Sequence, residues 1–146
     1  MSTQVDSKVP RAKAVFHAMI PALAFLAGPP VATYVLAVTG LIMAASVIGG
    51  GRFSLFGIIF NKWIRPALRL GPGKLEEVAP HRFAEAVGSV FLLASSLAFG
   101  AGAKVLGESL ALIVVALAIL NAAAGICVGC QMYLLIKRAQ SKVLAS

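Results

Sequence analysis

Four long apolar segments constrain this chain more than any other feature. They cover residues 12–28, 31–49, 83–100 and 106–136, and the last contains 28 consecutive residues without a charged side chain, from 109 to 136. A membrane-spanning helix needs about 20 mostly apolar residues, with a range of about 17–25. The pattern therefore predicts an all-α membrane protein in which each segment crosses the bilayer once.

The composition excludes the main soluble classes. Of the 146 residues, 60% are hydrophobic and 12% are charged, whereas an ordinary soluble domain has about 25% charged residues. The net charge of +8 would suit nucleic acid, but the basic residues lie between the apolar segments, as they do in proteins of the bacterial inner membrane. We therefore expect the lipid bilayer, and not nucleic acid, as the partner of this charge.

The order of the segments predicts a single domain, residues 1–146, built as a four-helix transmembrane bundle of two hairpins. Gly28, Pro29 and Pro30 form the turn signal of the first hairpin. Residues 52–70, between the hairpins, alternate aromatic and aliphatic side chains with basic ones, which is typical of an amphipathic helix lying in the headgroup layer. The residues expected at this membrane interface are Arg52, Lys62, Trp63, Arg65 and Arg69.

The basic residues also predict an orientation. Twelve of the 13 Lys and Arg residues fall in the N-terminal arm, the central connection and the C-terminal tail, and Lys104 alone falls on the other side. Cytoplasmic loops carry such an excess of Lys and Arg. We expect both termini and the central connection to lie in the cytoplasm.

A Cys-x-x-Cys motif, Cys127 and Cys130, is the main candidate for chemistry. Two thiols at i and i+3 share a helix face, so they can be oxidised together, relay a disulfide or sulfane sulfur, or bind a soft metal. His17, in the first apolar segment, is a candidate thiol partner or metal ligand. The cytoplasm is reducing, which argues against a permanent disulfide.

The same segment also supports a packing role. Gly125 and Gly129 form a Gly-x-x-x-Gly pair that lets helices approach closely, and Asn121 would hydrogen-bond across that seam. Thiols in the middle of a helix within hydrocarbon are inert, because burial disfavours the thiolate. A helix broken at Gly125 or Gly129 would favour reactivity instead.

Two further polar residues precede the third apolar segment. Arg82 and Glu85 are three residues apart and are expected to form an ion pair at the membrane interface. His81 is expected at headgroup level, and the sequence indicates no partner for it.

Three stretches resemble a bacterial membrane family known as domain of unknown function 4395. They are GRFSLFGIIFNKWIRP at 51–66, PHRFAEAVGSVFL at 80–92 and LNAAAGICVGCQMYLLIKR at 120–138. The resemblance implies a small multi-spanning protein in which the cysteine pair is a family feature. It also implies a thioredoxin-like or sulfur-transfer protein as a partner, and it names no reaction.

Three functions remain open. The first is thiol redox or sulfur relay through Cys127 and Cys130, the second is a non-catalytic subunit of a larger membrane complex, and the third is a carrier of a soft metal or small solute. No aspartate follows Asp6, and the sequence has no phosphate-binding loop, zinc-ligand spacing or Ser/His/Asp set. We therefore expect no stand-alone enzyme and no bound cofactor.

Overall fold

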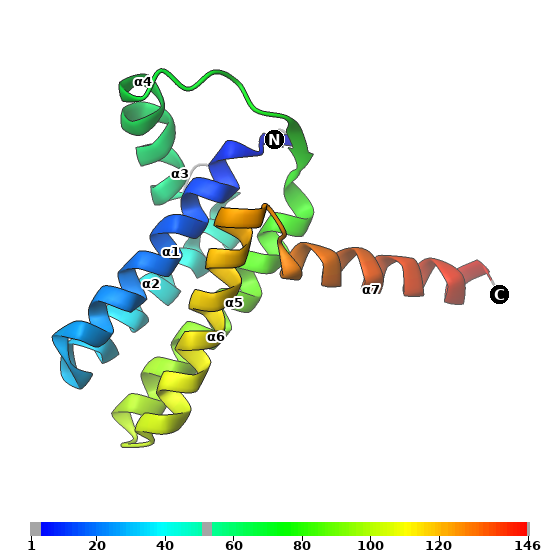
Figure 1. The fold of residues 1–146 in the computed structure, drawn as a ribbon. Helices are drawn as coiled ribbons and strands as arrows, with labels where there is room; N and C mark the ends of the chain where they lie inside the picture. The colour runs from blue at the N-terminus through cyan, green and yellow to red at the C-terminus, as the bar shows by residue number, and fades with distance from the viewer. Residues whose placement is uncertain (1–3, 51–53, 146) are drawn as a thin grey trace.

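The computed structural model describes residues 4–50 and 54–145 as a bundle of helices with a small sheet at one end (Figure 1). Four helices are long and apolar enough to cross a membrane, namely α1, α2, α5 and α6, which confirms the prediction of a helical chain with four such helices. The elements in chain order are β1 (Gln4–Asp6), α1 (Lys8–Ala27), α2 (Pro29–Gly49), α3 (Leu55–Ile59), the π-helical turn η2 (Phe60–Ile64), α4 (Arg65–Ala67), β2 (Leu75–Glu77), α5 (Val78–Gly100), α6 (Lys104–Ala124) and α7 (Val128–Ala145).

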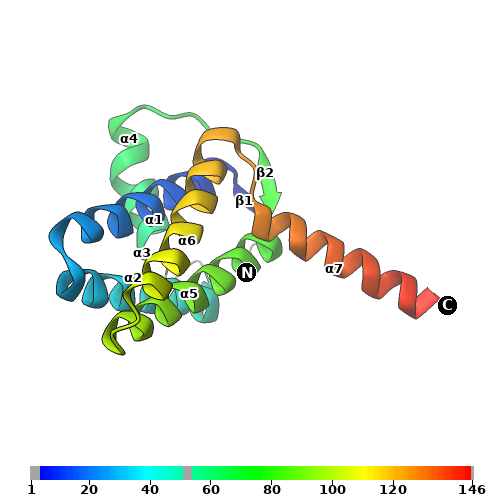
Figure 2. The same ribbon diagram turned by 60° about the horizontal axis from the view of Figure 1, so that its bottom comes forward.

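The turn between α1 and α2 lies at Gly28, as the sequence predicts. Gly28 has a φ of 99° and donates its N–H to the carbonyl of Phe25 at 3.3 Å. A positive φ is open to glycine at little cost, and Pro29 then begins α2 at a position where a missing N–H leaves no bond unmade. The two helices consequently run side by side in opposite directions (Figures 1 and 2).

The bundle closes as a ring of contacts. Helix α2 packs on α5, α5 on α6, α6 on α1 and α1 on α2. Leu36 of α2, Leu92 of α5 and Ala111 of α6 are fully buried at its centre. Ser95 Oγ donates to the carbonyl of Gly107 at 2.6 Å, a hydrogen bond between helices of the kind that joins spans in an apolar environment.

The connection between α2 and α5 contains a short helical run formed by α3, η2 and α4. Phe56 and Phe60 of this run are buried, and Phe56 lies 5.3 Å from Phe16 and 5.2 Å from His17 of α1, between ring centroids. Its aromatic face therefore packs partly on the bundle, whereas the sequence predicts one amphipathic helix over 52–70 that lies in the headgroup layer.

The predicted interface residues divide between exposed and paired positions. Trp63 is 71% exposed and Lys62 is also exposed, and their position in the headgroup layer stays a prediction. Arg65 instead pairs with Asp6, with 2.7 Å between Nη2 and Oδ2, and Arg69 adopts a φ of 49° after α4. Arg52 lies outside the described residues.

A two-stranded antiparallel sheet joins the N-terminus to the segment before α5. Val5 of β1 lies opposite Glu76 of β2, and the Asp6 carboxylate accepts hydrogen bonds from the backbone N–H groups of Gly73 and Lys8, both at 2.9 Å. These backbone bonds, the Gly73 bond foremost, and the Arg65 guanidinium lower the pKa of Asp6. The strands have three residues each, too short for a periodic signal, and the sequence did not predict them.

The last apolar segment departs from the prediction. A single helix was expected over 106–136, but α6 ends at Ala124 and α7 begins at Val128. Figure 1 shows α7 leaving the bundle at a steep angle to α6, and Figure 2 shows the same projection from another side. The hydropathy of this segment is continuous, so the position of the break depends on backbone conformation at Gly125.

Candidate dithiol site

The break between α6 and α7 is set by Gly125. This residue has a φ of 68° in the left-handed region, and its N–H donates to the carbonyl of Asn121 at 3.0 Å. Glycine is the usual residue at this position after a helix because a Cβ would be strained there. Gly125 therefore ends α6, and the next residues turn the chain toward α5.

The two cysteines lie at the N-terminus of α7. The Gln131 N–H donates to the carbonyl of Cys127 at 3.0 Å, the first bond of the helical pattern, so Cys127 is the N-cap residue. The Cys130 N–H donates to Cys127 Sγ at 3.3 Å, as a side-chain cap does. The two sulfur atoms are joined as a disulfide, with 5.1 Å between the Cα atoms.

This position changes the expected reactivity of the pair. The sequence placed both thiols in the middle of a helix, where they would be inert. At a helix N-terminus the unpaired N–H groups and the helix dipole favour negative charge, and reactive Cys-x-x-Cys motifs occupy such positions. The break at Gly125 therefore favours a chemical role for Cys127 and Cys130.

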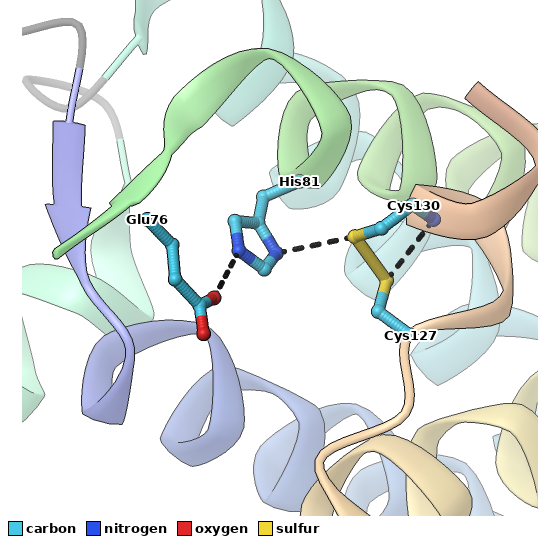
Figure 3. Close-up of a disulfide and its surroundings, with 4 residues drawn as sticks. All are labelled: Glu76, His81, Cys127 and Cys130. Carbon is cyan, nitrogen blue, oxygen red and sulfur yellow. Dashed lines mark hydrogen bonds and ion pairs between the residues drawn. A yellow bond between two sulfur atoms is a disulfide. The ribbon is translucent and has the colours of Figure 1, made fainter. Parts of the chain in front are cut away.

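His81 and Glu76 extend the site beyond the cysteines (Figure 3). His81 Nδ1 lies 3.4 Å from Cys130 Sγ, and His81 Nε2 lies 2.8 Å from Glu76 Oε2. His81 belongs to the first turn of α5, and the pairing of β2 with β1 holds Glu76 in front of it. Because Glu76 accepts the proton on Nε2, the lone pair of Nδ1 in neutral His81 faces Cys130.

An outer pocket of about 330 Å³ gives solvent access to the disulfide. Arg11, Glu76, His81 and Gln131 line it together with both cysteines. Cys127 and Cys130 are both partly exposed, so the disulfide is open to solvent on this side.

An inner cavity of about 240 Å³ lies on the other side of Cys127. It is lined mainly by apolar side chains of α1, α2, α5, α6 and α7, and its polar lining residues are His17, His81, Asn121 and the ion-paired Lys13 and Glu85. Cys127, His81 and Asn121 line both the inner cavity and the outer pocket. The disulfide therefore lies between the outer pocket and a mainly apolar inner cavity.

The same three side chains could hold a metal ion in the reduced protein. One ligand atom each from His81, Cys127 and Cys130 lies within 4.8 Å of the others. Two thiolates and an imidazole suit a soft or borderline ion such as Cu(I) or Zn²⁺. His17, the ligand considered from the sequence, is not a member of this group.

The packing residues predicted from the sequence are separated by the break. Gly125 and Gly129 do not share one helix face, because Gly125 ends α6 and Gly129 lies in the first turn of α7. Gly129 does permit a close approach: a Cβ there would lie 2.6 Å from the Cβ of Ala84 on α5. Asn121, expected to bond across a helix seam, lies in the wall shared by the two cavities.

The ion pair expected between Arg82 and Glu85 is replaced by contacts with other helices. Glu85 pairs with Lys13 of α1, with 2.6 Å between Oε1 and Nζ, and Arg82 donates to the carbonyl of Val47 at the end of α2. Spacing along one helix predicted the wrong partner because α1 and α2 bring groups closer than the neighbouring turn does.

Sequence reasoning missed the roles of His81 and Glu76. The sequence predicts His81 at headgroup level without a partner, and none of its motifs includes Glu76. Their five-residue separation is local, but their relation to Cys130 is not. Only the packing of α7 against α5 brings Cys130 to His81.

Comparison with known proteins identifies a family but no characterised relative. No curated protein and no solved structure matches the chain significantly. The model of a family described as "Domain of unknown function (DUF4395)" matches residues 5–138, a range that includes every described residue of the site. The chain therefore belongs to the DUF4395 family.

Proposed function

We propose that this protein is a membrane-embedded thiol–disulfide exchange protein whose redox pair is Cys127 and Cys130. The observation that carries the proposal is the position of both cysteines at the N-terminus of α7 with His81 Nδ1 3.4 Å from Cys130 Sγ. A helix N-terminus stabilises a thiolate, and an imidazole oriented by a carboxylate is an effective proton acceptor and donor.

The geometry assigns different roles to the two sulfur atoms. A partner thiolate attacks Cys127 Sγ, a new S–S bond forms, and the bond between Cys127 and Cys130 breaks with its electron pair on Cys130 Sγ. Protonated His81 gives this thiolate a proton through Nδ1. The second partner thiol then displaces Cys127, which leaves a disulfide in the partner and a dithiol in this protein.

The reverse direction uses the same groups. Cys130 transfers its proton to His81 Nδ1 while its sulfur attacks Cys127 in the mixed disulfide, and the partner leaves as a thiol. Two electrons and two protons are exchanged in each complete cycle. A thioredoxin-like or sulfur-transfer protein supplies partner sulfur atoms of this kind.

The proposal includes a membrane topology. The four long helices cross the bacterial inner membrane as two hairpins, with both termini and the central connection in the cytoplasm, supported by the distribution of Lys and Arg. Helix α7 lies along the cytoplasmic surface, since Val128, Met132, Leu135 and Val143 share one face. The dithiol then lies at the membrane surface, within reach of a soluble partner.

A redox titration in membranes tests the proposed function. Membranes are equilibrated with mixtures of reduced and oxidised glutathione, and free thiols are labelled with a maleimide that shifts the band on a gel. We expect Cys127 and Cys130 to change state together with one midpoint. The single variants Cys127→Ser and Cys130→Ser provide the positions of the one-thiol bands. A pair whose maleimide labelling does not change over the whole range of mixtures would contradict the proposal.

The ligand set of His81, Cys127 and Cys130 favours soft-metal binding as a second candidate function. Reduced protein in detergent is titrated with Cu(I) in competition with a chromophoric chelator. Binding of one ion that is lost in His81→Ala and in Cys127→Ser would support this alternative. A protein that leaves the chelator fully loaded would eliminate it.

A further inference from the structure

The inner cavity has the lining expected of a site for a lipid-soluble molecule. Met43, Phe91, Val114 and Leu117 contribute apolar walls from α2, α5 and α6. Leu117 is 39% exposed and Ile113, also in the lining, is 45% exposed, so the cavity opens through the side of α6 that faces lipid in the proposed topology. A ligand can therefore enter from the bilayer without passing through water.

The volume limits what the cavity can enclose. It measures about 240 Å³, slightly below the range of about 300–1,000 Å³ for sites that enclose whole drug-sized ligands. One flat ring fits such a space if the rest of the molecule extends through the opening at Ile113 and Leu117. This favours a ring with an attached apolar tail.

His17 provides a polar contact for the ligand. Its side chain is buried at 7% exposure, and its Nε2 has no hydrogen-bond partner among residues 4–50 and 54–145. A buried polar atom is normally paired. His17 lines the cavity, and its ring stands at a right angle to that of Phe56, with 5.2 Å between centroids. A turn of the imidazole toward the cavity would let an oxygen atom on a bound ring supply the missing partner.

Cys127 gives this cavity its chemistry. It is the cysteine that lines both cavities, whereas Cys130 lines the outer pocket. We propose that the inner cavity binds the ring of a membrane quinone, which accepts two electrons from the reduced Cys127–Cys130 pair. This inference rests on the proposed function, because it supplies the oxidant for the same dithiol.

The electron transfer balances within the site. The Cys127 thiolate forms a transient bond to a ring carbon of the quinone. Cys130 Sγ then attacks Cys127 Sγ, the carbon–sulfur bond breaks, and its electron pair reduces the ring to the hydroquinone. The hydroquinone oxygens take up two protons, one released from each thiol, and the proton of Cys130 reaches the ring through His81, which also lines the cavity. The products are one disulfide and one hydroquinone.

Quinone reduction by the purified full-length protein tests this inference. The protein is reduced in lipid nanodiscs, freed of reductant under anaerobic conditions, and mixed with the short-chain quinone ubiquinone-1. Its absorbance near 275 nm reports reduction, and maleimide labelling reports the thiols. We expect one hydroquinone for each disulfide formed, and none from Cys127→Ser.

A pair of matched variants locates the reaction in the cavity. Ala118→Phe places a ring in the cavity, because Ala118 lines it, and should reduce the rate by at least about tenfold. Ala116→Phe adds the same ring on an exposed side of α6 and should react as the wild-type protein does. His17→Leu should raise the quinone concentration at half-maximal rate by about tenfold, the effect of one lost hydrogen bond to a buried group.

The outcomes separate this inference from the proposed function. Wild-type protein that exchanges with glutathione disulfide but leaves ubiquinone-1 oxidised would overturn the quinone site alone. Ala118→Phe reacting as fast as wild type would overturn the cavity as its location. Failure to exchange with either reagent would overturn the proposed function, and the quinone step with it.

Discussion

His81 Nδ1 lies 3.4 Å from Cys130 Sγ, although 49 residues separate them in the chain. Glu76 Oε2 lies 2.8 Å from the other ring nitrogen, Nε2, and the sulfur belongs to the N-terminus of α7. Three elements thus meet in one chain of contacts, from Glu76 of β2 through His81 of α5 to Cys130 of α7. This meeting converts two cysteines at the end of an apolar segment into a candidate redox centre.

Replacing His81 should slow thiol exchange. In His81→Ala no imidazole accepts the proton of Cys130, and removal of a general base typically costs about 10²–10⁴-fold in rate. Glu76→Gln should cost less, since the imidazole remains. The rate of exchange of the reduced protein with a chromogenic disulfide at pH 7 measures both effects.

Glu77→Gln is the matched control for Glu76→Gln. It makes the same chemical change at the next residue of the same strand. Glu77 also lines the outer pocket, whereas the contact with His81 Nε2 is made by Glu76. Equal rates in Glu77→Gln and Glu76→Gln would contradict the role assigned to Glu76.

The two single-cysteine variants should differ as traps. Cys130→Ser leaves Cys127 able to form a mixed disulfide that Cys130 can no longer resolve, so a covalent complex with a partner protein should accumulate. Cys127→Ser removes the sulfur that lines both the inner cavity and the outer pocket. This variant should accumulate much less of the covalent complex. Non-reducing gels of membranes blocked with alkylating reagent show both. A stronger trap in Cys127→Ser would reverse the assigned roles.

Gly125→Ala should destabilise the break between α6 and α7. Gly125 has a φ of 68°, and a left-handed conformation costs other residues about 1–2 kcal/mol. The Arg11 side chain also occupies the space that a Cβ would need. Thermal unfolding in detergent, followed by circular dichroism, should show a lower midpoint for this variant.

Gly100→Ala is the control for that substitution. Gly100 ends α5 with open space around it and no positive φ, so the added methyl group should leave the midpoint unchanged or slightly higher. If both glycine variants behaved alike, the left-handed turn at Gly125 would not be important for stability.

The Asp6 carboxylate should make the small sheet sensitive to acid. The pKa of Asp6 is lowered in the folded protein from an ordinary value of 3.8, first by the N–H of Gly73 and then by that of Lys8. A lowered pKa means that the carboxylate stabilises the fold fully above pH 3.8 and loses this effect as the pH falls through the folded-state value. Asp6→Asn should therefore increase amide hydrogen exchange at 73–77 at pH 7.

Low pH should reduce the difference in amide hydrogen exchange between Asp6→Asn and the wild-type protein. Below the folded-state pKa the wild-type carboxyl is also neutral, so the two proteins should exchange at similar rates once the intrinsic effect of pH is corrected. A difference that persists unchanged into that range would exclude the Asp6 charge as its cause.

Much of the architecture is predictable because it depends on local sequence. Hydropathy locates the four long helices, and Gly28 with two prolines locates the first turn. The break at Gly125 is harder to predict. A glycine after Asn121 and three alanines is a helix-end signal, but the apolar run continues to residue 136 and resembles one long span.

The candidate site is only half predictable. The spacing of Cys127 and Cys130 identifies them, and it places the pair next to the basic end of the chain. Nothing in the spacing indicates Glu76 or His81, because β1 pairs with β2 through three residues on each side, a contact too short to leave a pattern. The partner of Glu85, Lys13, was missed because their contact crosses between two helices and leaves no pattern along either one.

The sequence by itself determined which segments are apolar, how many can cross a membrane, where the positive charge gathers and which two residues carry sulfur. The tertiary structure decided that α6 stops at Gly125, that Cys127 caps α7, and that His81 and a cavity lie against the two cysteines. The physical reason is one of range. Hydropathy and helix formation depend on residues within a few turns, whereas contacts of about 3 Å between groups from different elements depend on how whole helices pack.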